Sequence, residues 1–131
     1  MAKTAAQMVA EAKSRIDNLS VDEVAAAVAG GNVSLIDLRE PEERARQGMI
    51  PGAVPISRGM LEFYADPTSA YHRPEFDPGK QIIFHCAGGG RSALAADTLK
   101  QMGYDDVAHL EGGFGAWQAA GQKIEQSSAG Q

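Results

Sequence analysis

Residues 81–102 read QIIFHCAGGGRSALAADTLKQM, and this stretch decides the fold. Residues 81–85 are mostly apolar without alternation, as expected of a short strand that is buried on both faces. From residue 91 to 102 the apolar side chains recur mostly at helical spacing, and Gly103 follows as a helix stop. A buried strand that passes through a glycine loop into a helix is the repeating unit of a parallel α/β sheet.

The rest of the chain shows the same alternation. Ser20 and Glu23 form a capping box that starts one helix, and Gly30 and Gly31 stop it. Further strands are predicted at 33–37, within 50–57 and at 107–110, and further helices at 2–15, 41–47, 59–65 and 115–120. Because the strands are apolar and the connections are short, we predict one α/β domain of three layers, in which helices cover both faces of a parallel sheet.

Length, charge and cysteine content limit the class of protein. A chain of 131 residues is typical of one domain, and a formal net charge of −5 without a basic run argues against a nucleic-acid binder. The N-terminal residues lack the apolar core of a signal peptide, and no stretch approaches the roughly 18–20 apolar residues of a membrane span. We therefore expect a cytoplasmic protein that does not bind membranes. The one cysteine excludes an intramolecular disulfide.

That cysteine, Cys86, lies between the best strand and the best helix, where ligands of open α/β sheets bind. The glycines at 88–90 let the backbone curl so that its N–H groups converge, and the helix start adds partial positive charge at the same point. A thiol held there is expected to ionise more readily than a free cysteine. Arg91 can brace the loop or bind an oxyanion directly. These features predict a nucleophilic cysteine.

The alternative is a structural role, because free cysteines are often buried and inert, and a glycine turn can be purely structural. Thiol, glycines, helix start and arginine coincide within six positions, and this coincidence favours function. Asp37 and Arg39 are interpreted as an ion pair or cap that orders the loops near the site. His85 and Trp117 are interpreted as core residues. His85, His72 and His109 show no metal-ligand spacing with Cys86, so we expect no metal and no cofactor.

Four blocks in order make the chain resemble a single-domain rhodanese, a member of a sulfurtransferase family. They lie at residues 36–41, 50–53, 86–92 and 110–117. The resemblance covers residues 19–121, which leaves 1–18 as a helical extension and 122–131 as a flexible tail. It implies a central parallel sheet of about five strands flanked by helices.

By this resemblance Cys86 would accept sulfur as a persulfide, with Ser92 beside it. The loop amides would line an anion pocket, at residues Ala87, Gly88, Gly89, Gly90 and Arg91. Because residues 87–90 carry no charge, Arg58 is a candidate to supply one from a neighbouring loop. The implied donor is a small anion such as thiosulfate, and the implied acceptor is cyanide or a thiol.

Two other functions remain open. Cysteine phosphatases and arsenate reductases use a related loop that is one residue longer, whereas here four residues separate Cys86 from Arg91. A tetrahedral phosphate needs the wider cradle, so the loop length favours sulfur. The chain could also be a persulfide carrier or interaction module, which a partner protein of a sulfur relay loads. The uncharged loop is compatible with that role.

Overall fold

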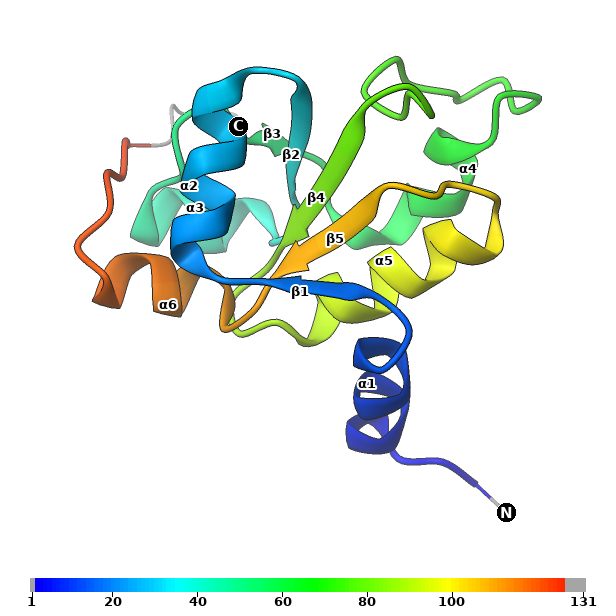
Figure 1. Cartoon of the computed structure of the whole chain (residues 1–131), viewed down its shortest axis with the longest axis horizontal. Coiled ribbons are helices and arrows are strands. Elements are labelled where there is room, and N and C mark those ends of the chain that lie inside the picture. The colour runs from blue at the N-terminus through cyan, green and yellow to red at the C-terminus, as the bar shows by residue number, and fades with distance from the viewer. Residues whose placement is uncertain (1, 127–131) are drawn as a thin grey trace.

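A parallel sheet of five strands forms the centre of the molecule (Figure 1). The computed structural model describes residues 2–126. The strand order is β1-β5-β4-β2-β3, and every pair of neighbours is parallel. The strands are β1 (Asp17–Leu19), β2 (Val33–Asp37), β3 (Val54–Pro55), β4 (Gln81–His85) and β5 (Val107–Leu110). The predicted α/β fold with about five parallel strands is therefore confirmed.

The helices agree with the predicted segments to within a few residues. They are α1 (Ala5–Lys13), α2 (Val21–Gly30), α3 (Pro41–Gln47), α4 (Leu61–Ala65), α5 (Gly90–Gln101) and α6 (Gly113–Ala119), with a 3₁₀ turn at η1 (Arg58–Met60) before α4. The capping box of Ser20 and Glu23 forms as predicted at the start of α2. The last helix begins two residues earlier than expected, because Gly112 is a left-handed N-cap.

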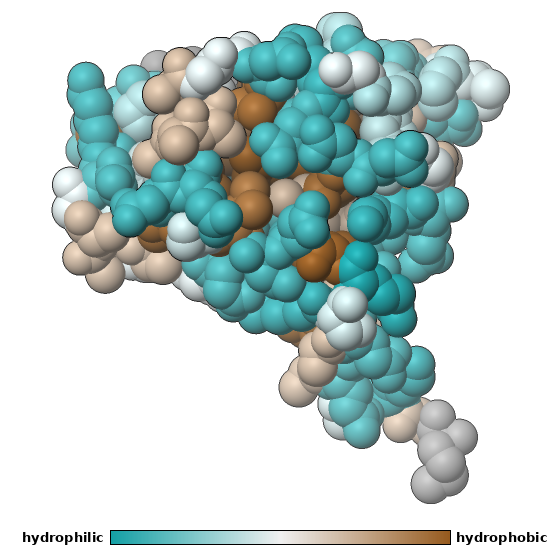
Figure 2. Space-filling view, viewed as in Figure 1, coloured by the Kyte–Doolittle hydropathy of each residue, from teal (hydrophilic) through white to brown (hydrophobic). Residues whose placement is uncertain are grey.

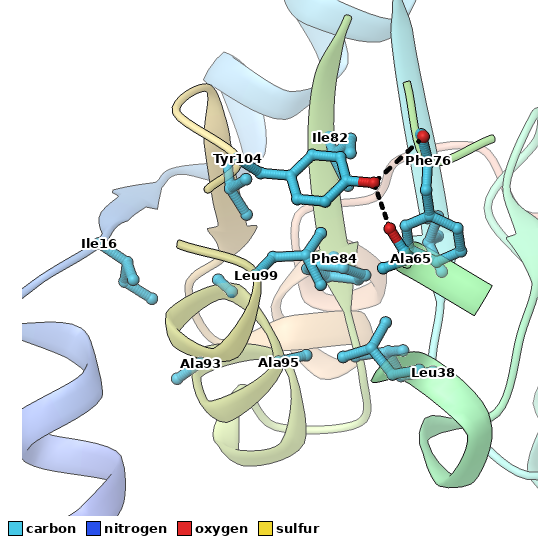
Figure 3. Packing of buried hydrophobic residues seen from close by; sticks show 14 of the residues in the cluster. Ile16, Leu38, Ala65, Phe76, Ile82, Phe84, Ala93, Ala95, Leu99 and Tyr104 are labelled. Atoms are coloured by element: carbon cyan, nitrogen blue, oxygen red, sulfur yellow. Dashed lines mark hydrogen bonds between the residues drawn. The ribbon is translucent and has the colours of Figure 1, made fainter. Parts of the chain in front are cut away.

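Hydrophobic side chains on both faces of the sheet hold the three layers together. Along β4, Ile82 and Phe84 pack with α1, α4 and α5, whereas Ile83 packs with α2 and α6. Figure 3 shows the first of these clusters, in which Leu99 of α5 lies close to Phe84 and the Tyr104 hydroxyl donates to the carbonyl oxygens of Ala65 and Phe76. Alternate residues of one strand thus serve opposite layers, which explains why the strand has few polar residues.

The N-terminal segment is joined to the sheet. Strand β1, which the sequence did not reveal, pairs with β5 at the sheet edge through Asp17, Asn18 and Leu19. Three residues with two exposed polar side chains give no periodic signal, so the tertiary pairing alone creates this strand. Helix α1 packs against α5 and projects below the body in Figure 1. The pairing of β1 with β5 therefore includes residues on both sides of the domain boundary that the sequence predicts between residues 18 and 19.

The segment after α6 contacts the body up to the last described residue. Glu125 and Met49 exchange two backbone hydrogen bonds of 2.7 and 2.9 Å, and the Trp117 indole donates to the Lys123 carbonyl. The sequence predicts a flexible tail from residue 122; within that segment Lys123 and Glu125 make these bonds to the body, and the flexibility of the tail stays a prediction. Residues 127–131 of that tail lie outside the described residues. Trp117 is a core residue, as predicted.

The face seen in Figure 2 is largely hydrophilic, and hydrophobic residues show through near its middle. Within residues 2–126, no helix combines the length and apolarity that crossing a bilayer would require.

Candidate active site

Cys86 is the first residue after β4, at the carboxyl edge of the sheet. Its sulfur accepts hydrogen bonds from the backbone N–H groups of Gly89 (3.2 Å) and Ser92 (3.4 Å). The loop can turn this sharply because Gly89 takes φ +106°, a value that other residues rarely adopt. The amide of Ser92 lies in the first turn of α5, so the sulfur is held at the positive end of the helix dipole.

Helix α6 holds the same loop from its other side. The amides of Phe114 and Gly115 donate to the carbonyl oxygens of Cys86 (2.8 Å) and Ala87 (3.1 Å). Gly113 lies so close that a Cβ atom there would be 2.6 Å from the Cys86 oxygen. The loop is thus clamped between two helix N-termini, and its geometry depends on residues far away in sequence.

Arg91 braces the loop, which is one of its two predicted roles. Its guanidinium makes two 2.9 Å hydrogen bonds to the carboxylate of Glu43 in α3. The guanidinium lowers the pKa of Glu43 to about 2, and the carboxylate in turn raises the pKa of Arg91. Because the two charges offset each other, Arg91 leaves little free positive charge for a bound anion.

Ser92 connects Cys86 to residues that the sequence did not single out as site residues. The Ser92 hydroxyl oxygen lies 3.5 Å from the Cys86 sulfur and 2.8 Å from Nδ1 of His109 in β5. Nε2 of His109 lies 2.8 Å from the amide oxygen of Asn18 in β1. His109 is fully buried. No sequence signal could have linked these residues, because the pairing of β1 with β5 brings Asn18 to the histidine.

Asp37 and Arg39 form the ion pair that the sequence predicts, and both are fully buried. The Arg39 guanidinium donates to both Asp37 oxygens (3.0 and 2.8 Å) and to the Gly48 carbonyl (2.8 Å), and it lies 4.0 Å from the centre of the Phe114 ring. The pair therefore ties the ends of β2 and α3 to α6. It orders the loops of this edge, and no hydrogen bond joins it to the Cys86 sulfur within the described residues.

The structure does not join Arg58 to the Cys86 loop. Its guanidinium binds Glu62 one helical turn later (3.0 and 3.3 Å). A cavity of about 350 Å³ lies beside it, past the ends of β2 and β3, and its lining includes Arg44 and Arg73. The sequence did not point to either of these arginines, because each belongs to an ordinary polar stretch. Arg58 as an anion-binding residue stays a prediction.

His85 is buried on the face opposite Cys86, as predicted, and its ring stacks on Phe114 at 6.3 Å. Neither ring nitrogen has a hydrogen-bond partner among the described residues. Burial lowers the pKa of His85 to about 4, although the Asp37 carboxylate 3.7 Å away acts in the opposite direction. The histidine is therefore neutral in the folded protein near pH 7.

This shift predicts that acidification begins to destabilise the protein at a pH above the range in which its carboxylates titrate. Between pH 6.5 and 4 the unfolded chain binds a proton at residue 85 that the folded chain excludes, so the free energy of unfolding falls by up to roughly 3 kcal/mol. His109, whose pKa burial also lowers, adds to the loss in the same direction. Urea denaturation at several pH values measures it. His85→Leu should reduce the dependence of the free energy of unfolding on pH, whereas the exposed control His72→Gln should leave it unchanged. An equal dependence on pH in wild type and His85→Leu would contradict the prediction.

Taken together, the fold and the site define a class of protein: a parallel α/β domain that holds one cysteine sulfur in a glycine loop at a helix N-terminus. The chain belongs to the rhodanese-like domain family, whose sequence pattern matches residues 20–120. The resemblance seen in the sequence is thereby confirmed.

Two thiosulfate sulfurtransferases and one protein of unknown function are similar to this chain. Thiosulfate sulfurtransferase GlpE of Pseudoalteromonas translucida is 33% identical over 96 residues, which cover 72% of this chain and 83% of that protein. A thiosulfate sulfurtransferase from Pseudomonas aeruginosa has a TM-score of 0.74 at 27% identity, with 95% of this chain and 23% of that chain covered. A protein of unknown function from Rhodopseudomonas palustris, described as a possible tyrosine phosphatase, is 46% identical, with a TM-score of 0.90 and 95% and 96% of the two chains covered.

Proposed function

We propose that this protein is a sulfurtransferase in which Cys86 carries sulfane sulfur as a persulfide. The observation that supports this most is the pair of backbone N–H groups, from Gly89 and Ser92, that donate to the Cys86 sulfur. Amides directed at a sulfur atom stabilise its negative charge, both on a thiolate and on the anion of a persulfide. An inert structural cysteine does not need such donors.

The reaction would proceed in two steps. The Cys86 thiolate attacks the outer sulfur of thiosulfate; a new S–S bond forms, the bond within thiosulfate breaks, and sulfite leaves with the electron pair. A second nucleophile, a thiolate in the cell or cyanide in an assay, then attacks the outer sulfur and releases the Cys86 thiolate. Because donor and acceptor use the same sulfur in turn, ping-pong kinetics are expected.

The burial of Cys86 is relevant to both steps. Only 1% of the residue is exposed, which is also what a structural cysteine would show. The sulfur nevertheless accepts hydrogen bonds from two backbone amides, and beside it Ala87 is half-buried and Gly88 is exposed. Small donors and acceptors are therefore favoured over bulky ones. A buried persulfide would also be protected from stray thiols in solution.

Phosphatase activity is the second candidate, because of the 46% identical relative from Rhodopseudomonas palustris. Two features of the site oppose it. The loop has four residues between Cys86 and Arg91, which leaves a narrow cradle. Glu43 also binds both terminal nitrogens of the Arg91 guanidinium, which leaves less of the cation available to phosphate oxygens. Sulfur transfer fits both features better.

Mass spectrometry of the intact protein tests the proposal. After treatment with thiosulfate, wild type should gain the mass of one sulfur atom, cyanide should remove it as thiocyanate, and Cys86→Ser should gain nothing. As Cys86 is the only cysteine, the gain can be assigned without mapping. Equal gains in wild type and Cys86→Ser, or no gain from any donor, would refute the proposal.

Two further assays separate the alternatives. Loading from a protein persulfide, but not from thiosulfate, would identify a carrier that a partner protein supplies. Hydrolysis of an aryl phosphate by wild type that is lost in Cys86→Ser would instead support the phosphatase.

A further inference from the structure

The hydrogen bonds around Asn18 fix the direction of a chain of hydrogen bonds that runs from this exposed residue to the buried Cys86. The Asn18 amide nitrogen donates to the carbonyl oxygens of Lys13 (2.9 Å) and Ile16 (3.2 Å). Its amide oxygen must therefore be the atom that faces Nε2 of His109 at 2.8 Å. An amide oxygen accepts and never donates, so Nε2 of His109 carries the hydrogen.

This tautomer determines every bond further along. A neutral imidazole with hydrogen on Nε2 has a bare Nδ1, and the Ser92 hydroxyl must donate to it over 2.8 Å. The hydroxyl hydrogen is then used, so the Ser92 oxygen can only accept from the thiol of Cys86 at 3.5 Å. The resulting order is thiol to hydroxyl, hydroxyl to imidazole, and imidazole to amide.

We propose that His109 is the proton acceptor for Cys86, connected through the Ser92 hydroxyl and held in the required tautomer by Asn18. The inference rests on the proposed function, in which Cys86 must lose its proton to attack a donor. As the thiol proton moves to the Ser92 oxygen, the Ser92 proton moves to Nδ1 of His109. The products are a thiolate and an imidazolium. Two protons move, and no bond forms or breaks other than the bonds to those protons.

The relay reverses its hydrogen bonds without moving a heavy atom. In the charged state the Ser92 hydroxyl donates to the thiolate, which keeps its bonds from the Gly89 and Ser92 amides. His109 then donates from Nδ1 to Ser92 and from Nε2 to Asn18. Both states thus satisfy the buried polar groups, which low-dielectric surroundings demand.

The charged groups near the relay have opposing effects on the imidazolium of His109. Glu111, at the end of β5, places a carboxylate oxygen 3.6 Å from Nε2 of His109, while Lys13 of α1 offsets it through a 2.8 Å ion pair. From α5, Arg91 adds positive charge near Cys86, and Glu43 of α3 neutralises it. The facing residue of β1 is the neutral Asn18. Burial lowers the pKa of His109, so the resting ring is neutral near pH 7 and the imidazolium forms only together with the thiolate of Cys86.

The N-terminal segment thereby acquires a role. The rhodanese-like match begins at residue 20, so Asn18 and α1 lie before it. Lys13 and Ile16 orient Asn18, and Val9 of α1 lies 3.8 Å from where a Cβ atom on Gly90 would be, next to the loop. The extension therefore orients a residue that contacts His109, and Asn18 is a positioning residue.

Two measurements test the relay, and neither depends on sulfur transfer. A long-range ¹H–¹⁵N spectrum of the reduced wild-type protein should show His109 with hydrogen on Nε2. The rate of alkylation of Cys86 by iodoacetamide near pH 7 should be roughly tenfold lower in His109→Gln and Ser92→Ala than in wild type, so that the curve of rate against pH moves to higher pH. The limiting rate at high pH should stay the same, because the thiolate is then formed by solvent hydroxide.

Matched control variants distinguish loss of the relay from nonspecific effects of substitution on the protein. Exposed His72→Gln and exposed Asn32→Ala should react as wild type does, whereas Asn18→Ala should shift in the same direction as His109→Gln. Hydrogen on Nδ1 of His109 in wild type would overturn the inference, and so would an unshifted profile in Asn18→Ala or in a folded His109→Gln. If His109→Gln does not fold, the wild-type spectrum and Asn18→Ala still decide. An absence of sulfur uptake alongside a shifted profile would refute the proposed function and leave the relay standing.

Discussion

Gly113→Ala is expected to destabilise the protein by about 3–5 kcal/mol and to displace the Cys86 loop. Gly113 has φ +62°, and a Cβ atom there would lie 2.6 Å from the Cys86 carbonyl oxygen and 2.7 Å from that of Ala87. Both contacts are with backbone, so no side-chain rotation relieves them. To make room, α6 must retreat from the loop, which weakens the hydrogen bonds from Phe114 and Gly115.

Gly121→Ala is the matched control for this prediction. Gly121 has a similar φ of +74°, but an added Cβ atom would meet nothing within 4 Å. It should therefore show the cost of left-handed backbone alone, about 1 kcal/mol. Urea denaturation compares the two variants, and sulfur uptake should fall in Gly113→Ala only. Equal urea midpoints for the two variants would show that the close approach of α6 to the Cys86 loop does not contribute to stability.

Asp37→Leu is expected to cost about 3–5 kcal/mol, because it leaves the Arg39 guanidinium buried without its carboxylate. Both side chains of the pair are fully buried, and Arg39 is held by two bonds to Asp37 and one to the Gly48 carbonyl. The variant fills the position with a larger, apolar side chain and removes the counter-charge. Chemical denaturation of wild type and variant measures the loss.

The double variant Asp37→Leu with Arg39→Met separates the charge effect from loss of packing. With both charges removed, the desolvation cost disappears, so much of the lost stability should return. If the double variant were as unstable as the sum of the single changes, the loops would depend on packing around Arg39 and Phe114 rather than on the ion pair.

Local sequence accounts for most of the fold. The strands at 33–37, 81–85 and 107–110 and the helix at 41–47 have the predicted bounds, because short apolar runs between glycines and charges leave few alternatives. Strand β1 escaped prediction, since its polar residues become a strand only through β5. Nor did the sequence reveal that Glu125, within the predicted tail from residue 122, pairs with Met49 from a distant part of the chain.

The sequence by itself placed Cys86 between strand and helix, and it supplied the glycines and helix start around it. Those features are local, because a few consecutive residues determine where a helix begins and where its amides point. Only the tertiary structure decided what the charged and polar side chains do. Arg91 meets Glu43, Arg58 meets Glu62, and Cys86 is joined through Ser92 to His109 and Asn18. Such partners come from separate strands and helices, and a sequence read along the chain contains no measure of the distance between them.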